Sequence, residues 1–336
     1  MNRKNLAFVL ILVGIVIFVL FKINSTPDSS AKIVSAPAGT LSLVSEPEAG
    51  IAPVLAKING AKKSVDLVMY EFEDMQVEQA LEAAKARGVL VRVLLNQGYY
   101  GKPEANNEPA YAYLQAHNVP VHWTPSYFAL THQKTLVVDG SDALIMTFNF
   151  TPQYYKSSRD FAVDDTDAND VSAIEKIFDA DWQGNTLSVS AGDDLVWSPG
   201  SRNAMLSLIE NATSSIEIYN EEMADPTITT ALEDVASRGV NVEVCMTYSS
   251  SWKNSFEDLA NAGVHVRTFA ASASLYIHAK VILVDSREAF VGSENFSPTS
   301  LDSNRELGLV VSDSNIINSL GKIFQNDWQN ATITQF

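Results

Sequence analysis

Hydrophobic and polar positions after residue 40 follow two different periods along the chain. Apolar residues recur every three or four positions in IAPVLAKINGA (51–61), QVEQALEAAKARG (76–88) and VSAIEKIFDADW (171–182), which predicts helices. SVDLVMY (64–70) and VLVRVLL (89–95) are apolar runs of strand length, and KTLVVD (134–139) with ALIMTFNF (143–150) predicts a hairpin. Strands that alternate with helices indicate an α/β fold, and the hairpin would make its sheet mixed.

This order of segments occurs twice. INGAKKSVDLVMYEF (58–72) matches IENATSSIEIYNEEM (209–223) at an offset of 151 residues. Later matches, including the DW pairs at 181–182 and 327–328, have an offset of 146, which a five-residue deletion in the second copy explains. The sequence therefore predicts two repeated α/β/α sandwich halves, 41–190 and 191–336, with mixed sheets packed about a pseudo-twofold axis.

The N-terminal segment has a different pattern. Arg3 and Lys4 precede sixteen uncharged residues, Leu6–Phe21, and no A-x-A-like cleavage site is evident after them. We expect residues 1–23 to be a membrane anchor or signal segment, and favour an uncleaved transmembrane helix. The basic residues favour a cytoplasmic N-terminus, which predicts a single-pass, membrane-anchored protein with its catalytic part outside the cytoplasm. Secretion after signal cleavage is the alternative.

Residues 24–40 are rich in Ser, Pro, Ala and Thr and predict a flexible linker. The chain after residue 23, linker included, contains 20 basic and 40 acidic residues, because three of the 23 basic residues lie in the N-terminal segment. A surface with this charge opposes nonspecific binding to nucleic acid, whose affinity comes mainly from phosphate neutralisation. Cys245 is the single cysteine, which excludes an intrachain disulfide.

A motif of fixed spacing ends each copy of the repeat. In the second copy it is H-x-K-x4-D-x6-G-S-x-N, formed by His278, Lys280, Asp285, Gly292, Ser293 and Asn295. In the first copy it consists of His132, Lys134, Asp139 and Asn149, with Met146-Thr147 in place of Gly-Ser. An acidic residue follows each histidine by 28 positions, and these acids are Asp160 and Glu306.

The residue types in this motif suit chemistry on a phosphodiester. Residues i and i+2 of a strand share a face, so each His and its Lys can reach one site. The reaction needs a nucleophile, a proton for the leaving oxygen and donors around the nonbridging oxygens. Histidine suits both proton roles and lysine holds phosphate, while the hydrogen-bond donors would be Asn149, Asn295, Ser293 and Thr147. A Lys beside each His would repel a cation, so we expect no metal and no other cofactor.

The paired motif resembles the phospholipase D superfamily, whose H-x-K-D signature occurs in two copies, and the resemblance extends from about Leu41 to the C-terminus. It implies that one His attacks phosphorus to form a phosphohistidine while the other protonates the leaving alcohol. The usual order in the family favours His132 as nucleophile and His278 as acid. Asp160 and Glu306 would hold the far nitrogens of the two imidazoles. Supporting rather than chemical roles are expected for Asp139, Asp285, Gly292 and Thr147. A residue as large as Met146 at the Gly position could crowd the phosphate, but Thr147 keeps a hydroxyl, so activity is still expected.

The leading functional hypothesis is a phospholipase D-type hydrolase that acts on phospholipid head groups beside a bilayer. Alternatives are an endonuclease of the same family, a cardiolipin synthase-like transphosphatidylase, and a non-catalytic module that binds phosphate. A phospholipid or another phosphodiester is thus the expected partner, and nucleic acid is the weaker alternative. Two motifs in one chain make a monomer sufficient for one active site.

Aromatic residues precede both motifs. Trp123, Tyr127, Phe128 and Tyr276 either line the mouth of the site or pack in the core, and the sequence leaves both interpretations open. His117, His122 and His265 have no histidine at the matching position of the other copy, and we expect them to be surface or structural residues.

Overall fold

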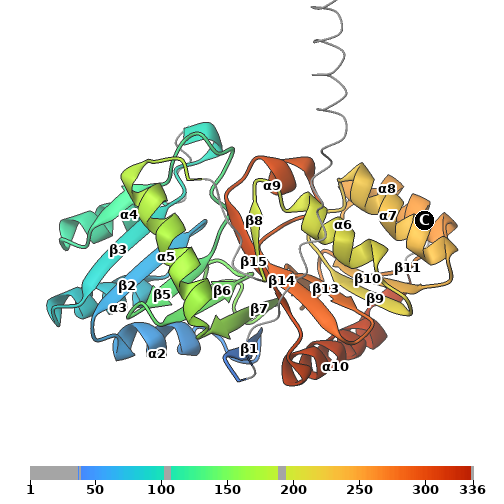
Figure 1. The fold of residues 1–336 in the computed structure, drawn as a ribbon, viewed down its shortest axis with the longest axis horizontal. Coiled ribbons are helices and arrows are strands. Elements are labelled where there is room, and N and C mark those ends of the chain that lie inside the picture. The colour runs from blue at the N-terminus through green and yellow to red at the C-terminus, as the bar shows by residue number, and fades with distance from the viewer. Residues whose placement is uncertain (1–36, 38, 102–106, 188–193, 334–336) are drawn as a thin grey trace, which may run out of the picture. The chain divides into compact units, whose positions relative to one another are not determined.

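Two mixed sheets form the framework of the structure, one for each copy of the repeat (Figure 1). The computed structural model describes residues 37, 39–101, 107–187 and 194–333. The first sheet has the strand order β1 (Leu41–Glu46), β7 (Ser158–Asp165), β6 (Asp142–Met146), β5 (Thr135–Val138), β2 (Ser64–Met69), β3 (Leu90–Leu95) and β4 (Val121–Trp123). The second has the order β8 (Leu195–Ser198), β15 (Glu306–Val311), β14 (Glu288–Gly292), β13 (Lys280–Val284), β9 (Ser215–Tyr219), β10 (Asn241–Thr247), β11 (His265–Phe269) and β16 (Thr332–Ile333).

The two sheets share one topology. In each, the three strands of the helix-connected part pair in parallel, as β2 with β3 and β3 with β4 do in the first half. The hairpin strands β5 and β6, like β13 and β14, pair antiparallel. The mixed sheets and the hairpins predicted from the hydrophobic pattern are therefore present in both halves.

Helices connect these strands in matching positions. The first half contains α2 (Ala52–Gly60), α3 (Met75–Ala86), α4 (Glu108–Ala116) and α5 (Ala168–Gln183). The second half contains α6 (Arg202–Glu210), α7 (Pro226–Ser237), α8 (Lys253–Asn261), α9 (Pro298–Asp302) and α10 (Ser314–Asn330). Four of these helices begin at an aspartate whose side chain accepts a hydrogen bond from a backbone N–H of the first turn, namely Asp74, Asp167, Asp225 and Asp313. Asp74 matches Asp225 in the repeat, and Asp167 matches Asp313. These helices therefore begin at equivalent positions in the two halves.

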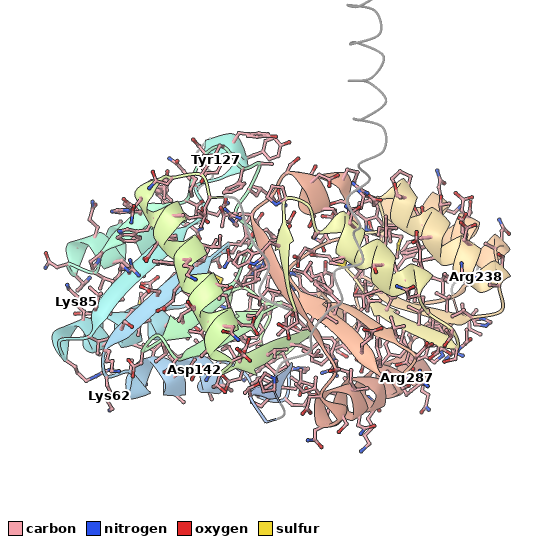
Figure 2. All side chains as sticks on the ribbon, viewed as in Figure 1. Lys62, Lys85, Tyr127, Asp142, Arg238 and Arg287 are labelled. Carbon is pink, nitrogen blue, oxygen red and sulfur yellow. The ribbon has the colours of Figure 1, made fainter. Side chains whose placement is uncertain are left out.

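The largest hydrophobic core contains residues of both halves. It includes Phe161 of β7 and Ile174 of α5 together with Leu309 of β15 and Phe324 of α10, all of which are buried. A second core cluster lies within the first half, around β2, β3 and helices α2 to α4. Figure 2 shows charged side chains such as Lys85, Arg238 and Arg287 at the periphery. Because the largest core is common to both sheets, we expect the two halves to fold as one unit.

Short segments cross from each half to pair with the other. β12 (Tyr276–Ile277) lies just before the second motif but pairs in parallel with β7 of the first sheet. In the equivalent place before the first motif, Thr131 forms a parallel bridge with Arg305, which precedes β15. The chain leading to each motif histidine is therefore hydrogen-bonded to the opposite half.

Two buried ion pairs also cross between the halves. The Arg159 guanidinium donates to Asp327 of α10 through Nε at 2.7 Å, and Arg305 donates to Asp181 of α5 through Nε at 2.9 Å. Arg159 is equivalent to Arg305 in the repeat, and Asp181 is equivalent to Asp327. All four residues are at most 7% exposed. The repeated DW pairs thus contain the carboxylates that receive an arginine from the other half.

The structure corrects the prediction of an N-terminal transmembrane helix and of a single-pass, membrane-anchored location. Among the described residues no helix is long and apolar enough to cross a bilayer, which needs about 20 apolar residues. The longest described helix, α10, has 17 residues and has polar positions along its length. The predicted anchor at 1–23 and all but three residues of the predicted linker lie outside the described residues. The supported fold is two mixed α/β sheets with their helices.

The predicted boundary between the halves stays a prediction. It falls at 190/191, within residues 188–193, which the structure does not describe. The described residues from 39 to 333 belong to one compact unit. This agrees with a core that both sheets share.

Replacing Asp181 with Ala should lower the free energy of unfolding by about 3–5 kcal/mol, because it leaves the Arg305 charge buried without its carboxylate. Chemical denaturation followed by circular dichroism measures this change. The matched control is Glu257→Ala, which removes a carboxylate from the exposed Lys253–Glu257 pair and should cost about 0.5 kcal/mol or less. Equal, small effects in both variants would show that the crossing ion pair does not hold the halves together.

Candidate active site

A cavity of about 850 Å³ contains residues of both halves in its wall. Five site residues predicted from the sequence line it, and these are His132, Asn149, Asp160, His278 and Asn295. Four others lie buried outside this lining, and these are Lys134, Lys280, Ser293 and Glu306. The structure therefore brings both motif histidines to one cavity.

Each histidine is held by the acid of the other half. Nδ1 of His132 lies 2.8 Å from Oε2 of Glu306, and Nδ1 of His278 lies 2.8 Å from Oδ1 of Asp160. The backbone N–H of each histidine donates to the carbonyl of the arginine before that acid. The sequence indicated one acid for each histidine, but it did not reveal that the pairs cross between halves.

Further hydrogen bonds fix the two carboxylates. Glu306 accepts from Ser300 Oγ at 2.5 Å and from Asn304 Nδ2 at 2.9 Å. Asp160 accepts from Thr147 Oγ1 at 2.5 Å. A carboxylate bound in this way on Nδ1 favours the tautomer that leaves the Nε2 lone pair of the imidazole available.

The hydroxyl groups of Ser293 and Thr147 form hydrogen bonds with other groups of the protein. Ser293 Oγ accepts from the backbone N–H of Leu307, and Thr147 Oγ1 accepts from that of Phe161 while donating to Asp160. Both side chains are fully buried and neither lines the cavity. The contacts of both hydroxyls are thus with the protein itself, and their donation to the phosphate stays a prediction.

Gly292 and Met146 face the core. A Cβ at Gly292 would lie 2.5 Å from the Cα of Gly308 and 2.6 Å from the Glu294 carboxylate, so close packing requires glycine there. Met146 fills the equivalent place in the first half, where it is fully buried and away from the cavity wall. Met146 thus packs in the core, and its effect on phosphate binding stays a prediction.

The two motif lysines have different neighbours. Each ammonium group donates to the carbonyl of the histidine two residues earlier. Lys134 Nζ then lies 5.0 Å from the ring centre of Tyr70, whereas Lys280 Nζ donates to Glu221 at 3.0 Å. Burial, followed by the charge of Lys280, lowers the pKa of Lys134 to about 7.

His132 is held as a neutral imidazole. Burial lowers its pKa to about 4, although the Glu306 charge acts in the opposite direction. The ring of Tyr70 packs against it edge-on at 4.6 Å between centroids. His278, by contrast, has a second carboxylate nearby, since Glu221 Oε2 lies 3.5 Å from its Nε2.

The two motif asparagines contact a matching pair of acids. Asn149 Nδ2 lies 3.4 Å from Glu71 Oε2, and Asn295 Nδ2 lies 3.4 Å from Glu222 Oε1. Burial raises the pKa of both glutamates. Sequence reasoning missed these acids, although their equivalent positions in the repeat were a signal that could have found them.

The motif aspartates lie at the other end of the hairpin strands. Asp139 accepts from the backbone N–H groups of Lys62, Lys63 and Ser64, which precede β2. Asp285 accepts from those of residues 213–215, which precede β9. Burial acts to raise the pKa of Asp285, but these bonds hold it well below its usual range. Neither residue lines the cavity.

Of the aromatic residues before the motifs, Tyr276 lines the cavity. Trp123 stacks on Tyr111, and Phe128 packs under the Arg305 guanidinium. Tyr127 is 43% exposed and its hydroxyl donates to the carbonyl of Asn185. Within the described residues, no group of three or more His, Cys, Asp or Glu side chains is arranged to hold a metal ion.

Comparison with known sequences finds lipid enzymes. Cardiolipin synthase 2 of Bacillus cereus is 23% identical over 237 residues, which cover 60% of this chain and 45% of that protein. Phospholipase D Y of Dictyostelium discoideum is 29% identical over 180 residues, 45% of this chain and 40% of that one. Mitochondrial cardiolipin hydrolase of Xenopus laevis is 27% identical over 136 residues, 40% of this chain and 62% of that one. The chain thus spans less than two thirds of the length of each of these relatives.

Solved structures share the fold. Phosphatidylserine synthase of Haemophilus influenzae superposes with a TM-score of 0.69 at 13% identity, over 90% of this chain and 89% of that one. Polyphosphate kinase of Porphyromonas gingivalis has a TM-score of 0.69 at 15% identity, over 86% of this chain and 47% of that one. A family model described as "Cardiolipin synthase, PLD-like domain" matches residues 54–182 and 205–328. Because this match includes both motifs and most of the chain, the protein belongs to the phospholipase D superfamily.

Proposed function

We propose that the protein is a phospholipase D-type phosphodiesterase that removes or transfers the head group of a phospholipid through a phosphohistidine. The observation that carries this proposal is the presence of two histidines in one cavity, each oriented by a carboxylate from the other half. The names of the relatives from Bacillus, Dictyostelium and Xenopus support a lipid substrate. A cavity of about 850 Å³ is large enough for a head group and its phosphate.

His132 is the nucleophile in this proposal. Its imidazole is neutral, and Glu306 at Nδ1 leaves the Nε2 lone pair to attack phosphorus. The bond between phosphorus and the leaving oxygen then breaks as the new P–N bond forms. Lys134, Asn149 and Asn295 supply positive charge and donors to the nonbridging oxygens.

His278 is the general acid. Its Nδ1 contacts Asp160 and its Nε2 lies 3.5 Å from Glu221, and in this proposal the ring gives a proton to the leaving alcohol. In the second step the neutral His278 takes a proton from water or from an acceptor alcohol. The resulting oxygen nucleophile attacks phosphorus and the P–N bond breaks, which restores His132. Water gives hydrolysis, and an alcohol gives transfer.

The choice between water and alcohol is the finer part of the proposal. We favour hydrolysis as the basal reaction, since water reaches any open cavity. The relative named cardiolipin synthase 2 supports transfer as the second candidate. Product analysis with and without added glycerol or phosphatidylglycerol separates the two, because transfer converts the head-group acceptor into a new phosphodiester.

The two histidines should respond differently to removal. A His278→Ala variant, given a phosphodiester with a good leaving group, should still form a phosphoenzyme because the departing group needs no proton. His132→Ala should form none, and both variants should lose several orders of magnitude in turnover with a lipid substrate. Acid-labile phosphate on the denatured protein, measured after labelling, reports the intermediate.

His122→Ala is the matched control for these variants. His122 is exposed and stacks on Trp182, with 3.8 Å between centroids, outside the cavity lining. Its replacement should leave turnover nearly unchanged. Labelling that survives His132→Ala and disappears in His278→Ala would reverse the two roles.

Activity should be greatest at mildly acidic pH. The nucleophile loses its lone pair only as the pH falls through the His132 pKa of about 4, and Lys134 loses its charge as the pH rises through about 7. The kcat/KM for a chromogenic phosphodiester, plotted against pH, should therefore decrease below about pH 4 and above about pH 7. Circular dichroism at each pH checks that the protein stays folded. An acid limb near 6.5, the ordinary value for histidine, would contradict the proposed environment of His132.

Chelation should leave activity intact. Lysines supply charge to the phosphate, asparagines supply donors and a histidine supplies the nucleophile, so each task has a protein group. The measurement is turnover of a chromogenic phosphodiester in detergent micelles after exhaustive treatment with EDTA. Activity that disappears and returns only with an added divalent cation would refute this mechanism.

A further inference from the structure

One position next to the motif differs in charge between the two halves. Residues 70 and 221 are equivalent at the offset of 151. Residue 70 comes directly after β2, and residue 221 comes just after the end of β9. In the first half this position is Tyr70, whose ring packs against His132 and beneath the Lys134 ammonium. In the second half it is Glu221. The first His–Lys pair therefore faces a neutral ring, and the second faces a carboxylate.

Three groups fix the Glu221 carboxylate in the cavity wall. Its Oε2 accepts from Lys280 Nζ at 3.0 Å and lies 3.5 Å from His278 Nε2, while its Oε1 accepts from the Tyr276 hydroxyl at 2.8 Å. Burial alone would raise the pKa of this carboxyl, but the charges of Lys280 and His278 more than offset burial and hold it well below its usual range. Glu221 is therefore a permanent negative charge at the second His–Lys pair.

This charge lies beside a group that the proposed mechanism brings to the phosphate. His278, the proposed acid for the leaving oxygen, has its Nε2 3.5 Å from Glu221, and Lys280 Nζ donates to the same carboxylate. A bound phosphate must therefore approach or displace a carboxylate. Coulomb repulsion grows with the charge of the ligand, so a dianion is penalised about twice as strongly as a monoanion at the same distance.

We propose that Glu221 is a specificity-determining residue whose fixed charge admits singly charged phosphodiesters and rejects doubly charged phosphate monoesters. This inference rests on the proposed function and concerns the same cavity. A phosphodiester has one charge, whereas a monoester has close to two at about pH 7, because its second pKa is about 6. Hydrolysis of a phospholipid head group converts the first class into the second. The same charge would thus favour release of the phosphomonoester product.

The test compares the binding of ethyl phosphate and diethyl phosphate at about pH 7. These ligands share their chemistry and differ in charge, and calorimetry measures their affinities without turnover. The wild-type protein should prefer diethyl phosphate. Glu221→Gln keeps the shape and removes the charge, so it should shift the ratio of the two dissociation constants towards ethyl phosphate by about tenfold or more.

Three further variants make the comparison specific. Glu221→Asp keeps the charge and should keep the ratio within about twofold of wild type. Glu221→Tyr copies the first half and should shift the ratio as Gln does, which provides a second neutral variant if Gln does not fold. Glu257→Gln removes one exposed carboxylate on α8, outside the cavity lining, and should leave the ratio unchanged.

The possible results separate this inference from the function on which it rests. A shifted ratio in the two neutral variants, and in neither control, supports the role of Glu221. An unchanged ratio in proteins that still bind diethyl phosphate overturns that role and leaves the proposed function standing. Failure of wild type and all variants to bind either phosphate would overturn the proposed function, and this inference with it.

Discussion

The exchange of backbone hydrogen bonds between the halves is the constraint on which the site depends. The chain before His132 bonds to Arg305, and the chain before His278 bonds to Arg159. Since the residue after each arginine is the acid that holds the imidazole, one backbone register sets both histidine–carboxylate contacts. The arginine side chains point into buried ion pairs with α5 and α10, which fixes the same register from the other side.

A symmetric framework of this kind supports an asymmetric site. Strand order, helix caps and the acids behind the histidines are the same in both halves, so the two imidazoles have similar supports. The difference comes from a few neighbours, among which Tyr70 and Glu221 stand out. The first imidazole packs against an aromatic ring, whereas the second lies between two carboxylates. Duplicated scaffolds can thus provide two distinct chemical roles by changing single side chains next to the reacting groups.

Much of the fold was predictable because the repeat presents each pattern twice. A single apolar run such as SVDLVMY is ambiguous between strand and buried helix, but its recurrence in the same order resolves the ambiguity. The spacing of His and Asn likewise identified residues that line the cavity, whereas the motif lysines lie buried outside its lining. Contacts between halves were not predictable, since spacing along one strand contains no information on which half supplies the partner. The spacing also did not reveal that the side chains of Ser293 and Met146 face the protein framework.

The crossed contacts also govern when the site can exist. His132 and Glu306 are separated by 174 residues, and Asp160 and His278 by 118. Contacts this distant in sequence close large loops and form late in folding. During synthesis, Glu306 is added 174 residues after His132. A chain that stops before Glu306 contains the first sheet and His132 but lacks the carboxylate that orients this histidine, so the first half alone cannot form the site.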